Sequence, residues 1–129
     1  MAPISASMTS DGPGMGGFSY KRLYQSYEER LIDWFNVQCY GSFSFDTYHE
    51  IIMNGYPPEK VVMGMESGQF TKDNFQQALD EVKKIQETYP AMGGVYDWEY
   101  LNAPRDEKDP SVWCQKMKHC YLLHWETLG

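Results

Sequence analysis

Short apolar runs alternate with longer stretches of mixed polarity along the chain. The apolar runs are mostly continuous, which is typical of parallel strands covered on both faces. They predict four strands, at residues 1–5, 34–40, 61–65 and 93–98.

Apolar positions recur at helical spacing after each of these runs. Gly55 lies in a C-terminal capping position, and Asp109 with Pro110 supplies the N-cap and first position of the last helix. The pattern predicts helices at residues 20–32, 46–54 and 71–89, and from Asp109 toward Trp125.

The same spacing predicts which helical side chains face the core. The third helix is the best defined, and Asp80 with Lys84 is expected to form an i,i+4 ion pair on its solvent side. The expected core positions are Leu23, Tyr24, Tyr27 and Leu31, then Tyr48, Ile51 and Ile52, then Phe75, Ala78, Leu79, Val82 and Ile85.

The predicted order is strand and helix in alternation, the pattern of a parallel α/β fold. The strands begin 33, 27 and 32 residues apart, counted from residues 1, 34, 61 and 93. A (β/α)8 (TIM) barrel takes ~250 residues, or about 31 per unit. The 129 residues therefore predict a partial barrel of four βα units with parallel strands.

The composition of the chain limits the classes of partner that it can bind. A net charge of −7 argues against nucleic acid and against an anionic membrane, and no run approaches the ~20 apolar residues of a membrane span. Aromatic residues make up 16% of the chain, which suits a surface that stacks on sugar rings and equally suits a bulky core. No signal peptide is predicted, because no basic region followed by an apolar run opens the chain, and the compartment stays open.

Neither a metal nor a cofactor is expected from the motifs. His119 and His124 are five residues apart, so they do not share a helix face as zinc ligands would. Three cysteines give no disulfide framework, and Cys39 is expected to be a buried thiol. No phosphate loop, nucleophile elbow or Ser-His-Asp arrangement can be assembled.

Polar and aromatic groups at strand ends are the remaining candidates. Alternation along the second strand turns Asn36, Gln38 and Tyr40 to one side, which is inward in a barrel. A ligand would satisfy these groups, and so would a polar layer between neighbouring strands. Two glycines lead into the last strand, which closes on Trp98, either a platform for a ligand or a core side chain.

Four segments, in order, resemble the C-terminal half of the family-18 glycoside hydrolases, the chitinase family. Met1-Ala2-Pro3 resembles the close of the fifth barrel strand, and Asp33 to Tyr40 resembles the sixth, with its pattern of Met or Gln, any residue, Tyr. Tyr56 to Met65 resembles the seventh strand with its proline-containing lead-in. Gly93 to Trp98 resembles the eighth strand with its closing tryptophan.

The resemblance implies a carbohydrate-binding role for particular residues. Trp98 matches the tryptophan that stacks on the sugar in the −1 subsite, Tyr40 the tyrosine that contacts the acetamido oxygen, and Gln38 the Met or Gln beside it. Met1 and Ala2 are expected at the edge of this subsite, and Glu66 is a candidate on its rim. Gly41 stands where many members have Asp or Asn, so one sugar contact is missing.

The acidic motif of the family, Asp-x-x-Asp-x-Asp-x-Glu on the fourth strand, does not occur in this chain. Its final Glu is the general acid of a substrate-assisted reaction. Asp97 and Glu99 flank Trp98, but alternation points both away from the face that Trp98 uses. Loss of a general acid costs about 10²–10⁴-fold in rate, so the chain alone is predicted to be inactive.

Three hypotheses follow. The first is that residues 1–129 are the C-terminal part of a chitinase-like catalytic domain, which would leave two sheet edges and an apolar interior uncovered. The alternative is a half-barrel that pairs with itself or another chain and binds chitin or another N-acetylglucosamine-containing glycan without cutting it. In the third, a separate N-terminal half supplies the missing acids.

Overall fold

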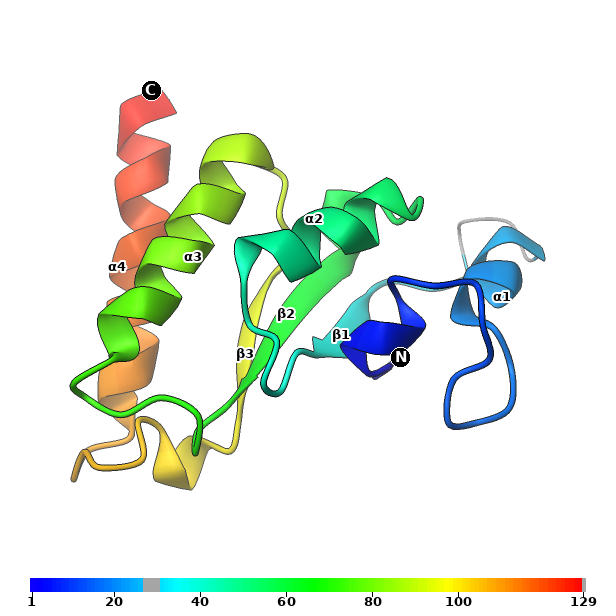
Figure 1. Ribbon diagram of the computed structural model, residues 1–129. Coiled ribbons are helices and arrows are strands. Elements are labelled where there is room, and N and C mark those ends of the chain that lie inside the picture. The colour runs from blue at the N-terminus through cyan, green and yellow to red at the C-terminus, as the bar shows by residue number, and fades with distance from the viewer. Residues whose placement is uncertain (27–30, 129) are drawn as a thin grey trace.

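The computed structural model describes residues 1–26 and 31–128, with side chains up to residue 120. The strands form one parallel sheet in the order β1-β2-β3, and this part of the chain holds four α-helices (Figure 1). The strands are β1 (Phe35–Gln38), β2 (Val61–Glu66) and β3 (Gly94–Trp98); the helices are α1 (Tyr20–Ser26), α2 (Phe45–Met53), α3 (Phe75–Thr88) and α4 (Ser111–Leu128). Three short 3-10 helices join them, η1 (Ser5–Ser7), η2 (Pro58–Lys60) and η3 (Tyr100–Asn102).

The α/β class, the parallel pairing and three of the four predicted strands are confirmed. The segment at residues 1–5 is not a full strand, because only Ile4 makes a bridge, to Gln38. Backbone bonds from Asn36 N to Met1 O and from Gln38 N to Pro3 O keep the segment extended beside β1. The pairing stops where the Ile4 carbonyl accepts from Ser7 N and the chain turns into η1.

The first helix is shorter than predicted. Among the described residues α1 ends at Ser26, and Tyr27 lies outside the described residues. Tyr24 is buried, as expected. Leu31, predicted to face the core, is 69% exposed, because it lies in a bend beyond the helix.

The next two helices agree closely with the pattern. Ser44 caps α2 by accepting from Thr47 N at 3.2 Å, and Gly55 has a φ of 106°, the left-handed conformation expected after a helix. The predicted core positions of α2 and α3 are buried, except that Ile52 and Leu79 are partly buried.

The predicted Asp80–Lys84 ion pair is wrong. Lys84 Nζ instead lies 3.2 Å from the Glu81 carboxylate, three residues back, while Asp80 accepts from Gln76 Nε2 at 2.9 Å. Competing polar neighbours on the same helix surface therefore decide the pairing.

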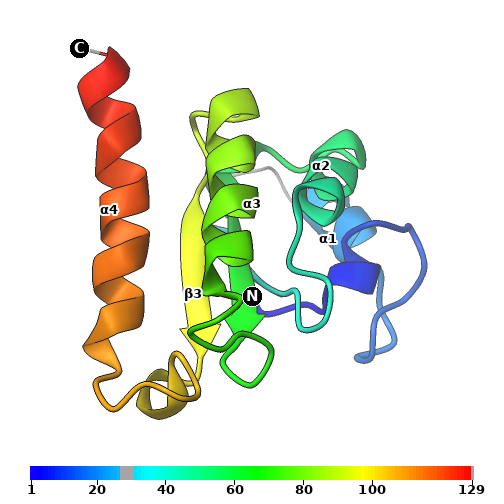
Figure 2. The same ribbon diagram turned by 60° about the vertical axis from the view of Figure 1, so that its left-hand side comes forward.

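The last helix begins as predicted and runs to Leu128, with Asp109 accepting from Ser111 N at 2.9 Å. Figure 2 shows α3 and α4 side by side along the sheet. None of the described helices is both long and apolar enough to cross a membrane.

Strand register divides the sheet into two chemically different faces. Phe35, Val37, Val61, Met63 and Met65 are fully or almost fully buried and belong to one core cluster with side chains of all four helices. The other face carries polar, aromatic and glycine residues: Asn36, Gln38, Gly64, Glu66, Gly94, Tyr96 and Trp98, with Val62 as its aliphatic member.

This second face corrects the expectation of an uncovered apolar interior. Within the described residues no helix covers it, yet most of its side chains have hydrogen-bonding groups. Trp98 is the one exposed large apolar side chain among the strand residues of this face, at 62%, whereas others, for example Leu31 and Trp34, lie outside the strands and are 69% and 51% exposed.

The three cysteines are free. Cys39 is fully buried, as predicted, and its burial raises the pKa of the thiol to about 12. Cys114 is exposed. A neutral, buried thiol packs as a small apolar side chain, so Cys39 is part of the core.

Candidate functional site

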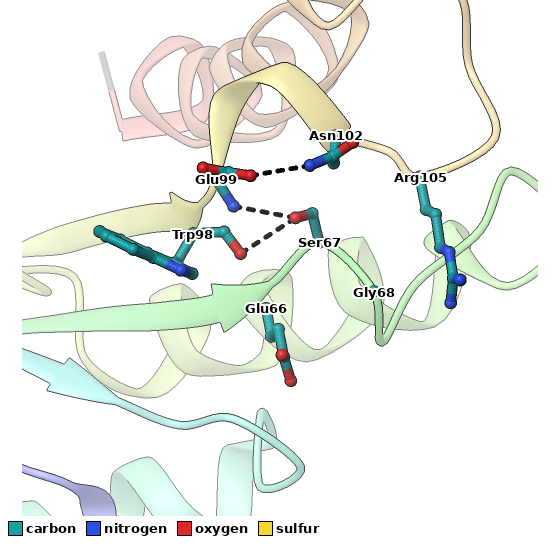
Figure 3. Close-up of a pocket in the computed structure, with 7 residues that line it drawn as sticks. All are labelled: Glu66, Ser67, Gly68, Trp98, Glu99, Asn102 and Arg105. Atoms are coloured by element: carbon teal, nitrogen blue, oxygen red, sulfur yellow. Dashed lines mark hydrogen bonds between the residues drawn. The ribbon is translucent and has the colours of Figure 1, made fainter.

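The carboxyl ends of β2 and β3 form one wall of a cleft of about 340 Å³ (Figure 3). Glu66 and Trp98, the last residues of these strands, are partners in the parallel register. Trp98 is 62% exposed, so it is not a core side chain. Glu66, Ser67, Gly68, Trp98, Glu99, Asn102 and Arg105 line the cleft.

Ser67 fastens the two strand ends together. Its backbone N–H donates to the Trp98 carbonyl at 2.9 Å, and its hydroxyl donates to the same carbonyl at 3.0 Å. The hydroxyl also accepts from Glu99 N at 2.9 Å (Figure 3). Ser67 is only 6% exposed, so its side of these bonds has little contact with water.

Glu99 and Asn102 continue this arrangement into η3. The Glu99 carboxylate accepts from Asn102 Nδ2 at 2.8 Å, which fixes the start of the turn that follows Trp98. Arg105 extends from the far side of the cleft in Figure 3. The cleft therefore contains two carboxylates, an amide and a guanidinium beside an exposed indole, a mixed set suited to a polar ligand with hydroxyl groups.

Tyr40 and Tyr96 form a second polar pair on the same face of the sheet. Burial raises the pKa of Tyr96, and a side-chain hydrogen bond with Tyr40 raises it further. Tyr96 is the register partner of Gly64, and a Cβ at position 64 would overlap the tyrosine ring. The glycine therefore lets the Tyr96 ring lie against the strand, where its hydroxyl reaches Tyr40.

Gln38 is the last residue of β1, two positions before Tyr40, and its side chain already makes a hydrogen bond within the chain. Its Nε2 donates to the Ala2 carbonyl at 2.8 Å, so the structure brings Gln38 and Ala2 together. Met1 does not join this group. It lines an apolar hollow with Leu23, Leu31 and Ile32, and its amino group donates to the Trp34 carbonyl at 3.1 Å, at the other end of β1.

Gly41, the departure from the family pattern, has a backbone reason. Its φ of 76° lies in the left-handed region, which glycine, Asn and Asp adopt more readily than other residues. Gly41 N donates to Gln69 Oε1 at 3.0 Å, which holds the turn after Tyr40. Glycine thus meets the backbone requirement while leaving no side chain there.

Asp97 lies on the opposite face from Trp98, as alternation predicts. Its register partner is Met65, and Trp113 of α4 donates to the Met65 sulfur at 3.0 Å. Both carboxylate oxygens of Asp97 are buried, and neither has a hydrogen-bond partner among the residues that the structure describes. Desolvation raises the pKa of Asp97 to about 7, so the group belongs to the packing beneath the helices and not to the cleft.

Four participants are absent from the sequence interpretation: Tyr96, Ser67, Asn102 and Arg105. Tyr96 stands two residues before Trp98, so the alternation that placed Trp98 also placed Tyr96 on that face. Ser67 and Asn102 gave no such signal, because their partners depend on the register of the next strand. Among the residues that the structure describes, no group of three His, Cys, Asp or Glu side chains is placed to hold a metal ion.

Neither a family model nor a curated protein matches the chain significantly. Two solved structures do. A fungal endo-beta-N-acetylglucosaminidase from glycosyl hydrolase family 18 is 28% identical with a TM-score of 0.77, and the match covers 92% of this chain and 44% of that one. A chitinase from Aspergillus fumigatus is 27% identical with a TM-score of 0.66, covering 92% of this chain and 45% of that one.

The chain thus spans less than half the length of the two structures that it matches. Its α/β fold with a parallel sheet is similar to the barrels of these enzymes, whereas the four-unit count and the barrel strand numbers stay predictions. The likeness extends over nearly all of the chain, and the predicted resemblance to the family-18 glycoside hydrolases is confirmed.

Proposed function

We propose that residues 1–129 form the C-terminal part of a chitinase-like family-18 domain and hold a glycan that contains N-acetylglucosamine. Trp98 stacks on a sugar ring, Tyr40 contacts the acetamido group, and Gln38 lines the same subsite. Ala2 lies at its edge through its contact with Gln38, and Glu66 lies on its rim.

The observation that carries the proposal is the exposed indole of Trp98 at the carboxyl edge of the parallel sheet. Sites in α/β folds form at this edge, and a flat aromatic face with hydroxyl and amide groups nearby suits a sugar, which has both apolar and hydroxyl-bearing sides. The two similar structures are an endo-beta-N-acetylglucosaminidase and a chitinase, which supports a glycan that contains N-acetylglucosamine.

The chain is proposed to bind without cleaving. Its sequence lacks the acidic motif that supplies the general acid, and the one strongly perturbed carboxyl near Trp98, that of Asp97, lies on the other face of the sheet. Glu66 and Glu99 line the cleft, but each lies beside the tryptophan at a strand end, and neither reproduces the spacing of the motif.

A non-catalytic half-barrel that pairs with itself or with an N-terminal half is the alternative. The outer edge of β3 has no paired strand within the described residues, and such an edge accepts another strand. In the third form of the proposal, a partner at this edge brings the missing acids.

The test is the affinity for N-acetylchito-oligosaccharides, measured by isothermal titration calorimetry. Trp98→Ala is expected to weaken binding about 10- to 100-fold, the value of about 1.5–3 kcal/mol for an aromatic contact. Trp34→Ala is the matched control. Trp34 is 51% exposed and precedes the amino end of β1, whereas the cleft lies at the carboxyl ends of the strands. Equal affinity of the unmodified chain and Trp98→Ala would refute the proposal.

A further inference from the structure

We propose that Ser67 is a positioning residue that sets the orientation of the Trp98 indole. The positioning role rests on the proposed function in one respect, that the oriented indole stacks on a sugar ring. Ser67 itself does not need to touch the ligand.

The bonding of Ser67 is directed at the backbone on both sides of the Trp98 carbonyl. The Trp98 carbonyl receives two donors, Ser67 N at 2.9 Å and Ser67 Oγ at 3.0 Å. The Glu99 N–H is held by the same hydroxyl at 2.9 Å. One side chain thereby fixes the peptide plane that follows Trp98, and with it the direction in which the Trp98 side chain leaves β3.

The hydroxyl uses its donor and one of its two acceptor positions. A serine hydroxyl has one donor and can accept, and here the donor goes to Trp98 and an acceptor position receives Glu99. Because Ser67 is 6% exposed, water has little access to replace these bonds. Removal of the hydroxyl leaves the Glu99 N–H without its acceptor, while Ser67 N still holds the strand ends together.

Side-chain direction is the property at stake, because Trp98 has few other restraints. Its side chain is 62% exposed, and in Figure 3 the indole extends away from the carboxylate of Glu66. A mostly exposed indole is expected to sample more orientations once the peptide that follows Trp98 loses two of its three bonds to Ser67. Sugar stacking requires one orientation, so the hydroxyl of Ser67 contributes to affinity without contact.

The first experiment reads the orientation directly and needs no ligand. In a ¹H–¹⁵N spectrum of the full chain, Trp98→Phe identifies the Trp98 indole signal. Ser67→Ala is expected to shift or broaden that signal and leave the other indole signals in place, and Ser67→Thr, which keeps a hydroxyl, is expected to restore it. Ser44→Ala is the matched control, since it removes a capping hydroxyl from α2, away from Trp98. An unchanged Trp98 signal in Ser67→Ala overturns the proposal.

Hydrogen exchange of the unmodified chain provides a measurement that does not depend on a variant folding. The Glu99 amide is expected to exchange slowly because its N–H donates a hydrogen bond to the hydroxyl of Ser67, a buried residue. Exchange of this amide at the rate of an open loop overturns the proposal.

The second experiment measures N-acetylchito-oligosaccharide affinity by calorimetry. Ser67→Ala is expected to weaken binding about 3- to 10-fold, the range that corresponds to one neutral hydrogen bond, and Ser67→Thr to recover most of it. Normal affinity in Ser67→Ala, together with a strong loss in Trp98→Ala, overturns the positioning role alone. If Trp98→Ala binds normally, the proposed function fails, and the indole spectrum still decides the role of Ser67.

Discussion

At the scale of single residues, Gly64 shows how a missing side chain shapes a surface. Tyr96 of β3 lies over its register partner Gly64 of β2, and its side chain is hydrogen-bonded to Tyr40, which follows β1. The three residues come from three neighbouring segments, so the position of one ring depends on the smallest residue in the middle strand. Tyr40, the residue matched to the acetamido contact, is therefore placed partly by Gly64.

Gly64→Ala is expected to destabilise the fold by about 1–3 kcal/mol, the usual cost of overpacking, because the new methyl group overlaps the Tyr96 ring. Urea denaturation followed by circular dichroism measures this change. Gly68→Ala is the matched control, since a Cβ there has open space and the backbone has an ordinary φ. The double variant Gly64→Ala/Tyr96→Ala should lose less than the sum of the single changes. Strict additivity would contradict the contact.

At the scale of elements, the strands are two-faced and the alternation in the sequence predicts most of this. Trp98 and Asp97 were assigned to opposite faces from sequence, and the register agrees. The hydrogen bonds of the Ser67 hydroxyl cannot be predicted from the sequence, because they depend on the register between β2 and β3. The end of α1 was also misjudged, since apolar spacing continued to Leu31 after the described helix had ended at Ser26.

The packing of β3 beneath α4 is expected to depend on pH through Asp97. Its folded-state pKa of about 7 lies above the ordinary value of 3.8, so the folded chain keeps the proton in a range where the unfolded chain has lost it. Stability is therefore expected to fall as the pH rises from about 4 to 7 and to level off above that.

Asp97→Asn removes this ionisation. The variant is expected to gain about 1–2 kcal/mol over the unmodified chain at pH 8, a discounted value because the residue is only partly buried, and much less at pH 4.5. Urea midpoints at both pH values give the comparison, with the exposed Asp73→Asn as the control. An advantage of the same size at both pH values would show that ionisation of Asp97 is not responsible.

At the scale of the molecule, the chain matches 44% and 45% of two larger enzymes and carries one set of strand ends. These ends provide an aromatic face, amides and hydroxyls. They do not include the acidic motif, so binding and bond cleavage are proposed to depend on different parts of a larger assembly.

The chain alone is expected to release no product from a chromogenic chito-oligosaccharide, because its sequence lacks the motif that carries the general acid. A fungal family-18 enzyme serves as the positive control. The same assay with an added N-terminal half examines the proposal that a partner supplies the acids. Turnover by the purified chain that is lost in Glu66→Gln would contradict the prediction and assign the acid to the cleft.

The uncovered face of the sheet, with its amides, phenols and indole, has a consequence for what the molecule meets in water. Such groups form hydrogen bonds with the solvent, so this face is not a contiguous apolar patch that would drive two chains to associate. The outer edge of β3, which has no paired strand in the part of the chain that the structure describes, is a more favourable place for association than this face. A partner that binds there must supply a strand. The face itself is free to replace hydration with the hydroxyl groups of a glycan.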